Sequence, residues 1–202
     1  MVTVTMLEPI GKSKYRAGFD NGMTCLLYSG EVRRLSLTLG DVLDDSVYDT
    51  IMEEILKKRA IKRAMHLLEQ MDRSESCLRE KLTQGEYPSE CIEAAIDYVK
   101  SYNYLNDLRF AKTYIRYHME GMSKQQLTLK LMQKGIGRED IRLALEEDYI
   151  DNEENLIMAL LEKKHFNPTE MEEKEKKHIY QYILRRGFNS NDILRCMRKY
   201  LT

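Results

Sequence analysis

Residues 78–96, LREKLTQGEYPSECIEAAI, carry the pattern that decides the fold of this 202-residue chain. Apolar side chains recur in this stretch at Leu78, Leu82, Tyr87, Ile92 and Ile96. The same ladder occurs twice more, at Leu127, Leu131, Ile136, Ile141 and Leu145, and at Ile179, Ile183, Phe188, Ile193 and Met197. The offsets within each copy are 4, 5, 5 and 4 residues, and the copies begin 49 and then 52 residues apart. A repeat of this size is typical of stacked helical units, each too small to bury its apolar face alone.

The ladder predicts a mainly α-helical protein with three tandem repeats of three helices each. Helical periodicity begins near Asp49, where Ile51, Ile55 and Leu56 fall on one stripe. We place the three repeats at residues 46–104, 105–150 and 151–202. Such arrays usually present a long surface to a partner instead of enclosing a reaction, so the repeat favours a binding function.

Local signals mark where individual helices begin and end. Asp72 opens a D-x-x-E capping pattern and Ser123 an S-x-x-Q pattern, which predict helix starts at these positions. Gly135 and Gly187 directly precede the middle residue of the second and third ladders. This is the position expected for a glycine that ends a helix by adopting the left-handed backbone conformation. In the first ladder Gly85 lies one place earlier, so we expect that turn to differ.

Residues 1–45 have a different pattern and predict a small antiparallel β element followed by a linker. Val and Thr alternate from Val2 to Met6, and Asn21-Gly22 separates two apolar runs. Asn and Gly tolerate the positive φ of tight hairpin turns, so this dipeptide is a good hairpin signal. We expect about three strands, which are too few to be stable alone and therefore pack on a helix.

The charge distribution is neutral as a whole and uneven along the chain. Lys and Arg number 32 against 33 Asp and Glu, so no global basic excess points to nucleic acid. Residues 151–175 carry a net charge of −5, whereas residues 176–202 carry +6. Two interpretations stay open: the basic segment binds an acidic protein face or phosphates, or the two segments are neighbouring helix faces that attract each other.

The sequence contains no recognisable catalytic or metal-binding motif. None of the four histidines has metal-ligand spacing, and the four cysteines form no CxxC pair. Glycine-rich phosphate loops and nucleophile elbows are also absent from the sequence. We therefore predict a protein that is not an enzyme, with no cofactor and no metal. The chain has no secretory signal or membrane-spanning run, which predicts a cytoplasmic location with reduced cysteines.

Several of the 13 tyrosines lie next to basic residues. Basic residues interleaved with aromatic rings can bind single-stranded nucleic acid by phosphate pairing and base stacking. Tyr87, Tyr114 and Tyr182 lie on apolar stripes, which favours a half-buried packing role. Tyr117 lies off the stripe, so both interpretations stay open there.

Four motifs give the chain a resemblance to a known family. The run R-S-x-x-x-L-x-x-K-L occurs at residues 73–82, and Y-L-N-D-x-R-F-A occurs without a break at residues 104–111. Tyr114-Ile115-Arg116 and the turn Lys134-Gly135-Ile136 follow. With these motifs the chain resembles the RecX family of recombinase regulators, strongly over about residues 47–150 and by pattern alone in the third repeat.

The resemblance implies three three-helix repeats in an elongated, curved molecule. It also implies a protein without catalytic activity that binds in the groove of the RecA filament on single-stranded DNA. Such proteins typically suppress the ATPase, strand-exchange and coprotease functions of RecA. We expect contacts to RecA or DNA from basic and aromatic residues of all three repeats. The candidates are Arg73, Arg79, Lys81, Arg109, Lys112, Arg116, Tyr117, Lys130, Lys134, Arg185, Arg186, Arg195, Arg198 and Lys199.

Other binding functions remain open. The chain could bind DNA directly through its basic third repeat, or serve as a helical scaffold for a different partner. Affinity for bare DNA that falls steeply with salt would indicate a direct DNA-binding protein. A capped repeat array is typically monomeric, and we expect a monomer with no membrane partner.

Overall fold

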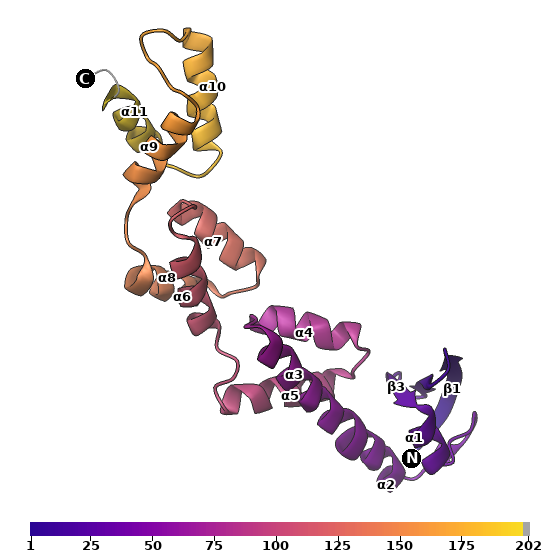
Figure 1. Cartoon of the computed structure of the whole chain (residues 1–202). Coiled ribbons are helices and arrows are strands. Elements are labelled where there is room, and N and C mark those ends of the chain that lie inside the picture. The colour runs from indigo at the N-terminus through magenta and orange to yellow at the C-terminus, as the bar shows by residue number, and fades with distance from the viewer. Residues whose placement is uncertain (200–202) are drawn as a thin grey trace. The chain divides into compact units, whose positions relative to one another are not determined.

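The structure of the protein is a computed structural model that describes residues 1–199 (Figure 1). Helices predominate, and a small sheet lies at the N-terminal end of the chain. The chain divides into two compact units, Met1–Asn106 and a second unit that begins at Asp107. Residues 200–202, the end of the predicted third repeat, lie outside the described residues.

The predicted antiparallel sheet is confirmed, with one strand more than expected. Its strands β1 (Val2–Ile10), β2 (Lys14–Phe19), β3 (Thr24–Tyr28) and β4 (Val42–Leu43) lie in the order β3-β2-β1-β4. The hairpin between β2 and β3 turns at Gly22, whose φ is +82°. The two residues of β4 fall in the predicted linker, because so short a strand has no detectable alternation.

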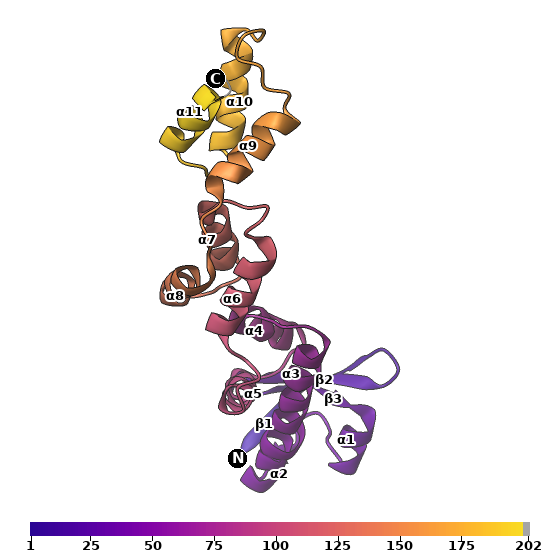
Figure 2. The ribbon, with the colours of Figure 1, turned by 60° about the vertical axis from the view of Figure 1, so that its left-hand side comes forward.

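The sheet and the first repeat share one core. Helix α1 (Ser29–Arg34) follows β3, and α2 (Asp45–Asp49), the π-helical segment η1 (Thr50–Lys57) and α3 (Lys58–Gln70) follow one another without a gap. Buried residues of the sheet belong to the same apolar cluster as those of η1 and α3, beside which the strands lie in Figure 2. The expectation that the sheet packs on a helix is therefore confirmed.

Three repeats of three helices are present, as predicted. The first has α3, α4 (Glu75–Gln84) and α5 (Ser89–Ser101); the second has α6 (Asp107–His118), α7 (Lys124–Gln133) and α8 (Arg138–Asp148); the third has α9 (Glu153–Lys163), α10 (Glu173–Leu184) and α11 (Ser190–Lys199). The ladder residues are buried, except Tyr87 and Met197, which are half-buried. The second and third repeats each have a buried cluster of their own.

The turn inside each repeat contains a residue with positive φ directly before the middle ladder residue. Gly135 (φ +78°) and Gly187 (φ +80°) have the predicted left-handed conformation. In the first repeat Glu86 holds this position with φ +56°, whereas Gly85 has φ −81°. The expected difference in the first turn is thus that a side-chain-bearing residue adopts the left-handed conformation.

One of the two predicted helix starts is confirmed. The Ser123 hydroxyl accepts a hydrogen bond from the backbone N–H of Gln126, so Ser123 caps α7. The prediction at Asp72 is wrong, because α4 is capped by Ser74, whose hydroxyl accepts from the backbone N–H of Cys77 at 3.3 Å. Ser74 is buried and extended (φ −72°, ψ 157°), so the chain enters the helix two residues later than the pattern indicates.

Candidate partner-binding surface

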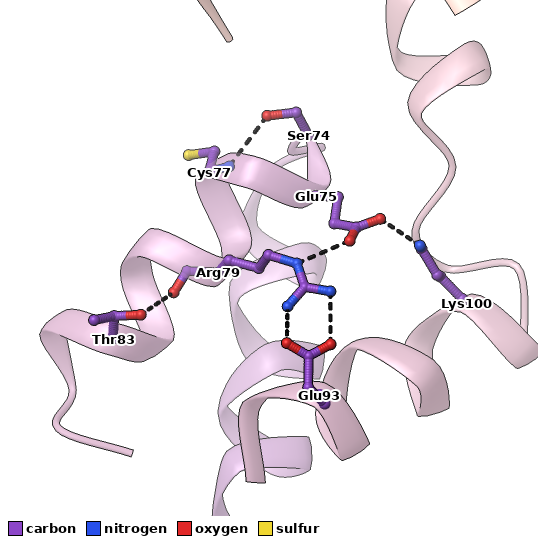
Figure 3. Close-up of polar contacts among 7 residues, drawn as sticks. All are labelled: Ser74, Glu75, Cys77, Arg79, Thr83, Glu93 and Lys100. Atoms are coloured by element: carbon purple, nitrogen blue, oxygen red, sulfur yellow. Dashed lines mark hydrogen bonds and ion pairs between the residues drawn. The ribbon is translucent and has the colours of Figure 1, made fainter. Parts of the chain in front are cut away.

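In the first repeat, Arg79 is engaged within the molecule (Figure 3). Its Nε donates to Glu75 on the same helix and its Nη2 to Glu93 on α5, both at 2.8 Å. Lys100 of α5 pairs with the other oxygen of Glu75. The hydrogen bonds from Arg79 hold the pKa of the Glu93 carboxyl below its ordinary value. Burial acts to raise the pKa of Glu75, but the hydrogen bonds from Lys100 and Arg79 outweigh it and lower the pKa. Arg79 therefore joins α4 to α5.

The other two candidates of the first repeat, Arg73 and Lys81, differ in how far contacts within the molecule occupy their side chains. Nε of Arg73 donates to the carbonyl oxygen of Leu67 at 3.3 Å. Nη1 of the same side chain donates to Sγ of Cys77 at 3.7 Å. Arg73 thereby satisfies a carbonyl near the C-terminal end of α3, where helical partners are lacking. Lys81 is exposed, and among the described residues its Nζ donates only to Gln84 on the same helix, at 3.1 Å.

In the second repeat, two basic candidates join α6 to α8. Lys112 pairs with Glu147, and Arg116 donates from Nε to Asp148 at 2.7 Å. Asp148 is the more buried partner, with 14% of its side chain exposed. Its pairing raises the pKa of Arg116, first through the hydrogen bond and then through the opposite charge. Both cations stabilise the repeat.

Two further candidates lie over aromatic rings. Nζ of Lys134 lies 5.8 Å from the ring centre of Phe110 and 5.4 Å from that of Tyr114. The guanidinium of Arg186 lies 4.9 Å from the ring centre of Tyr182. Both contacts are cation–π interactions, worth roughly 0.5–1 kcal/mol at exposed sites. Tyr114 and Tyr182 are half-buried, as is Tyr87, so their predicted packing role is confirmed.

In the third repeat, acidic and basic helix faces meet. Lys199 on α11 pairs with Glu154 on α9, and the hydrogen bond lowers the pKa of Glu154. Arg195 lies 3.7 Å from Glu154 and pairs with Asp192 at 2.7 Å. Part of the charge pattern of this region thus comes from neighbouring helices that attract each other, one of the two interpretations left open by the sequence.

Four candidates remain available to a partner. Within residues 1–199, the side chains of Tyr117, Lys130, Arg185 and Arg198 have no hydrogen-bond or ion-pair partner. All four are exposed, and Tyr117 is 81% exposed. The remaining candidate, Arg109, is exposed on α6 and has an interaction within the chain.

Several exposed cations outside the candidate set also lack an acidic partner among residues 1–199, and four of them lie on α3 and α10. Lys62 and Arg63 lie on α3, and Lys174 and Lys177 lie on α10; none has an acidic partner in the described part of the chain. The three-residue spacing of the α10 pair places it on one helix face and was a detectable signal. The acidic residues around Lys174 and Lys177 in the sequence obscured this signal.

The buried thiols belong to the apolar cores. All four cysteines are free, and three of them, Cys25, Cys91 and Cys196, are buried. Burial raises the pKa of Cys25 to about 12 and that of Cys91 to about 11, so both remain protonated at neutral pH. Across residues 1–199, no group of three or more His, Cys, Asp or Glu side chains is arranged to hold a metal ion. No described helix is both long and apolar enough to cross a membrane.

Models of all three RecX three-helix domains match the chain in order. The first domain matches residues 60–98, the second residues 106–145 and the third residues 152–197. A relative from Clostridium beijerinckii, described as regulatory protein RecX, is 26% identical over 100% of this chain and 97% of its own length. A regulatory protein RecX from Yersinia enterocolitica is 33% identical, over 66% of this chain and 92% of the relative.

Solved structures show the same fold. A crystal structure of a regulatory protein RecX superposes with a TM-score of 0.65 at 21% identity, covering 95% of this chain and 97% of the other. The crystal structure of RecX from Lactobacillus salivarius gives a TM-score of 0.63 at 21% identity, over 71% of this chain and 96% of the other.

These findings place the protein among helical-repeat proteins with a small sheet fused to the first of three three-helix repeats. More narrowly, the chain belongs to the RecX family.

Proposed function

We propose that this protein is a non-catalytic regulator of the recombinase RecA and acts as an inhibitor. It binds along the groove of the RecA filament on single-stranded DNA and suppresses ATPase, strand exchange and coprotease activity. The observation that carries the proposal is the match of three consecutive RecX domains across residues 60–98, 106–145 and 152–197. Relatives that match nearly the whole chain are described as regulatory proteins, which supports the same proposal.

The proposed mechanism rests on many weak contacts made by one chain. Three linked repeats let each bound repeat raise the effective concentration of the next one at its site, which gives avidity without a deep pocket. Tyr117, Lys130, Arg185 and Arg198 make contacts to the filament in this proposal, because no partner within residues 1–199 occupies them. A chain that bridges adjacent RecA protomers resists the motions that ATP turnover requires.

The other candidates have a supporting part in this proposal. Cations that pair within a repeat hold its helices in place, so the surface offered to the filament is already formed. This group comprises Arg73, Arg79, Lys112, Arg116, Lys134, Arg186, Arg195 and Lys199. Lys81 and Arg109 are exposed and add weaker contacts at the rim.

We further propose a cytoplasmic monomer without cofactors, with functional segments at residues 1–45, 46–104, 105–150 and 151–202. The first segment shares its core with the second and stabilises it. Sedimentation at micromolar concentration tests the oligomeric state. A mass of one chain is expected, and a dimer would contradict this part of the proposal.

The ATPase rate of RecA on single-stranded DNA, titrated with this protein, tests the regulatory function. We expect the rate to fall at fewer than one chain per RecA protomer, because one chain bridges several protomers. An unchanged rate, together with no binding to preassembled filaments, would contradict the proposal.

Direct binding to single-stranded DNA is the second candidate function. The exposed cations Lys174, Lys177, Arg185 and Arg198 of the third repeat favour it, since they lack acidic partners in the described structure. Binding that depends on phosphate contacts weakens steeply with salt, because condensed counterions are released on binding. Affinity for an oligo(dT) strand from 50 to 200 mM salt therefore distinguishes this function from regulation that requires RecA.

A further inference from the structure

A groove on the third repeat lies outside the helix contacts described so far. It has a volume of about 560 Å³ and lies between α10, α11 and the loop that precedes α10. Tyr180 of α10 and Leu194 and Met197 of α11 contribute apolar surface to it, together with Phe166 of the loop. We call it the α10–α11 groove. All of its lining residues belong to one repeat, so the groove is complete within that repeat.

The apolar lining of the groove is partly uncovered. Leu194 is 41% exposed although it lies beside buried core residues of α11. The ring of Tyr180 is held in place by its hydroxyl, which lies 2.8 Å from the hydroxyl of Ser190. An exposed leucine beside a fixed aromatic ring resembles the pockets that hold a single apolar anchor of a binding partner.

The charges around the groove are basic. Glu173, the acidic residue in its lining, is paired with Lys176 at 2.8 Å. Lys177 and Arg198 also line the groove, and neither has an acidic partner within residues 1–199. After the internal pair cancels, two positive charges remain beside an apolar floor.

We propose that the α10–α11 groove binds a peptide segment of the filament protein that carries carboxylates next to an apolar side chain. The apolar side chain packs between Tyr180 and Leu194, and the carboxylates pair with Lys177 and Arg198. This inference deepens the proposed RecA-regulating function and rests on it.

The apolar floor favours a protein segment over a nucleic acid strand. A phosphodiester backbone would use Lys177 and Arg198 but would leave Leu194 exposed to water. An acidic peptide with an apolar anchor uses both features together, and burying an apolar side chain contributes more than an exposed ion pair. The cations then chiefly determine which partner binds and how fast it associates.

Two variants of the full chain test the groove. Leu194→Ser removes one apolar side chain of the groove floor, and the double variant Lys177→Glu/Arg198→Glu reverses the charge. The matched controls are Leu184→Ser, which changes a leucine of the same 41% exposure outside the groove, and Lys12→Glu/Lys163→Glu, which changes net charge equally at exposed positions elsewhere. Circular dichroism checks that each variant keeps its helices.

Binding is measured by fluorescence anisotropy of the labelled chain, with RecA filaments assembled on oligo(dT) with a slowly hydrolysed ATP analogue. We expect each groove variant to raise the Kd for filaments tenfold or more and each control to change it less than twofold. Bare oligo(dT) is titrated in parallel, where the groove variants are expected to behave as the wild type.

Three outcomes overturn the inference and leave the proposed function standing. Groove variants that bind filaments like the wild type exclude the groove as a contact. An equal loss on bare oligo(dT) assigns it to DNA, and an equal loss in the controls shows that the effect is not specific to the groove. A wild-type chain that neither binds filaments nor changes RecA ATPase overturns the proposed function itself, and the inference with it.

Discussion

At Gly187 the backbone conformation and a neighbouring side chain both require glycine. Its φ of +80° lies in the left-handed region, where a side chain costs roughly 1–2 kcal/mol. An added Cβ would lie 2.9 Å from the Ser123 hydroxyl oxygen and 3.0 Å from Cβ of Gln125. That hydroxyl caps α7 and donates to the carbonyl of Arg186 at 2.7 Å, so it cannot move without losing both bonds.

We therefore predict that Gly187→Ala lowers the free energy of unfolding by more than the backbone strain alone would. Gly22→Ala is the matched control, because Gly22 has φ +82° and an added Cβ there has nothing within 4 Å. Overpacking adds about 1–3 kcal/mol at Gly187. Urea unfolding followed by circular dichroism measures both variants, and equal losses would show that the contact with Ser123 has no energetic weight.

At the scale of elements, α4 and α5 are joined by a polar network whose strength depends on pH. Arg79→Ala leaves Glu75 and Glu93 without their shared cation. We predict a loss of about 1 kcal/mol at pH 7, the upper end for ion pairs at a surface, since a third of the Arg79 side chain is exposed.

The pH dependence of this loss follows from the direction of the pKa shifts. Arg79 lowers the pKa of both carboxyls in the folded state, so its stabilisation is complete above their unfolded pKa of about 4.3. This stabilisation disappears as the pH falls through the lower pKa values that the two carboxyls have in the folded state. The wild type and Arg79→Ala should thus have equal stability at low pH. Arg142→Ala is the control: both of its partners lie on its own helix, α8, and a smaller loss at pH 7 is expected. A stability difference between the wild type and Arg79→Ala that stays constant across pH would contradict the assignment of the loss to the two carboxylates.

The sequence predicted the elements well, whereas it did not predict which charges pair. The three ladders were readable because burial in a helix repeats every three to four residues. The pairs Arg79–Glu93, Lys112–Glu147 and Lys199–Glu154 join residues 14, 35 and 45 positions apart. Such pairs depend on how helices pack, and no local pattern encodes that. The sequence therefore does not separate the paired cations among the candidates from the available ones, and that distinction comes from the fold.

At the scale of the whole molecule, residues 1–199 form three apolar cores that share no residue. The core of the sheet and first repeat holds 22 buried residues among those described, whereas that of the third repeat holds eight. In repeat proteins each unit has its own intrinsic stability, to which contacts with its neighbours add. A cavity in the third core should therefore open that repeat before it affects residues 1–106.

We predict that Ile183→Ala, at a fully buried position in α10, selectively unfolds the third repeat. Such a substitution costs about 2–5 kcal/mol, which a core of this size cannot absorb. Hydrogen exchange followed by mass spectrometry should show lost protection over residues 153–199 and unchanged protection over residues 1–106. Leu82→Ala, equally buried in the first core, should lower protection within residues 1–106, to a smaller extent because that core is larger, and leave residues 153–199 unchanged. Uniform loss along the chain in either variant would instead show that the repeats unfold as one cooperative unit. Selective unfolding would mean that the third repeat, which carries the α10–α11 groove, can be inactivated while the first repeat remains intact.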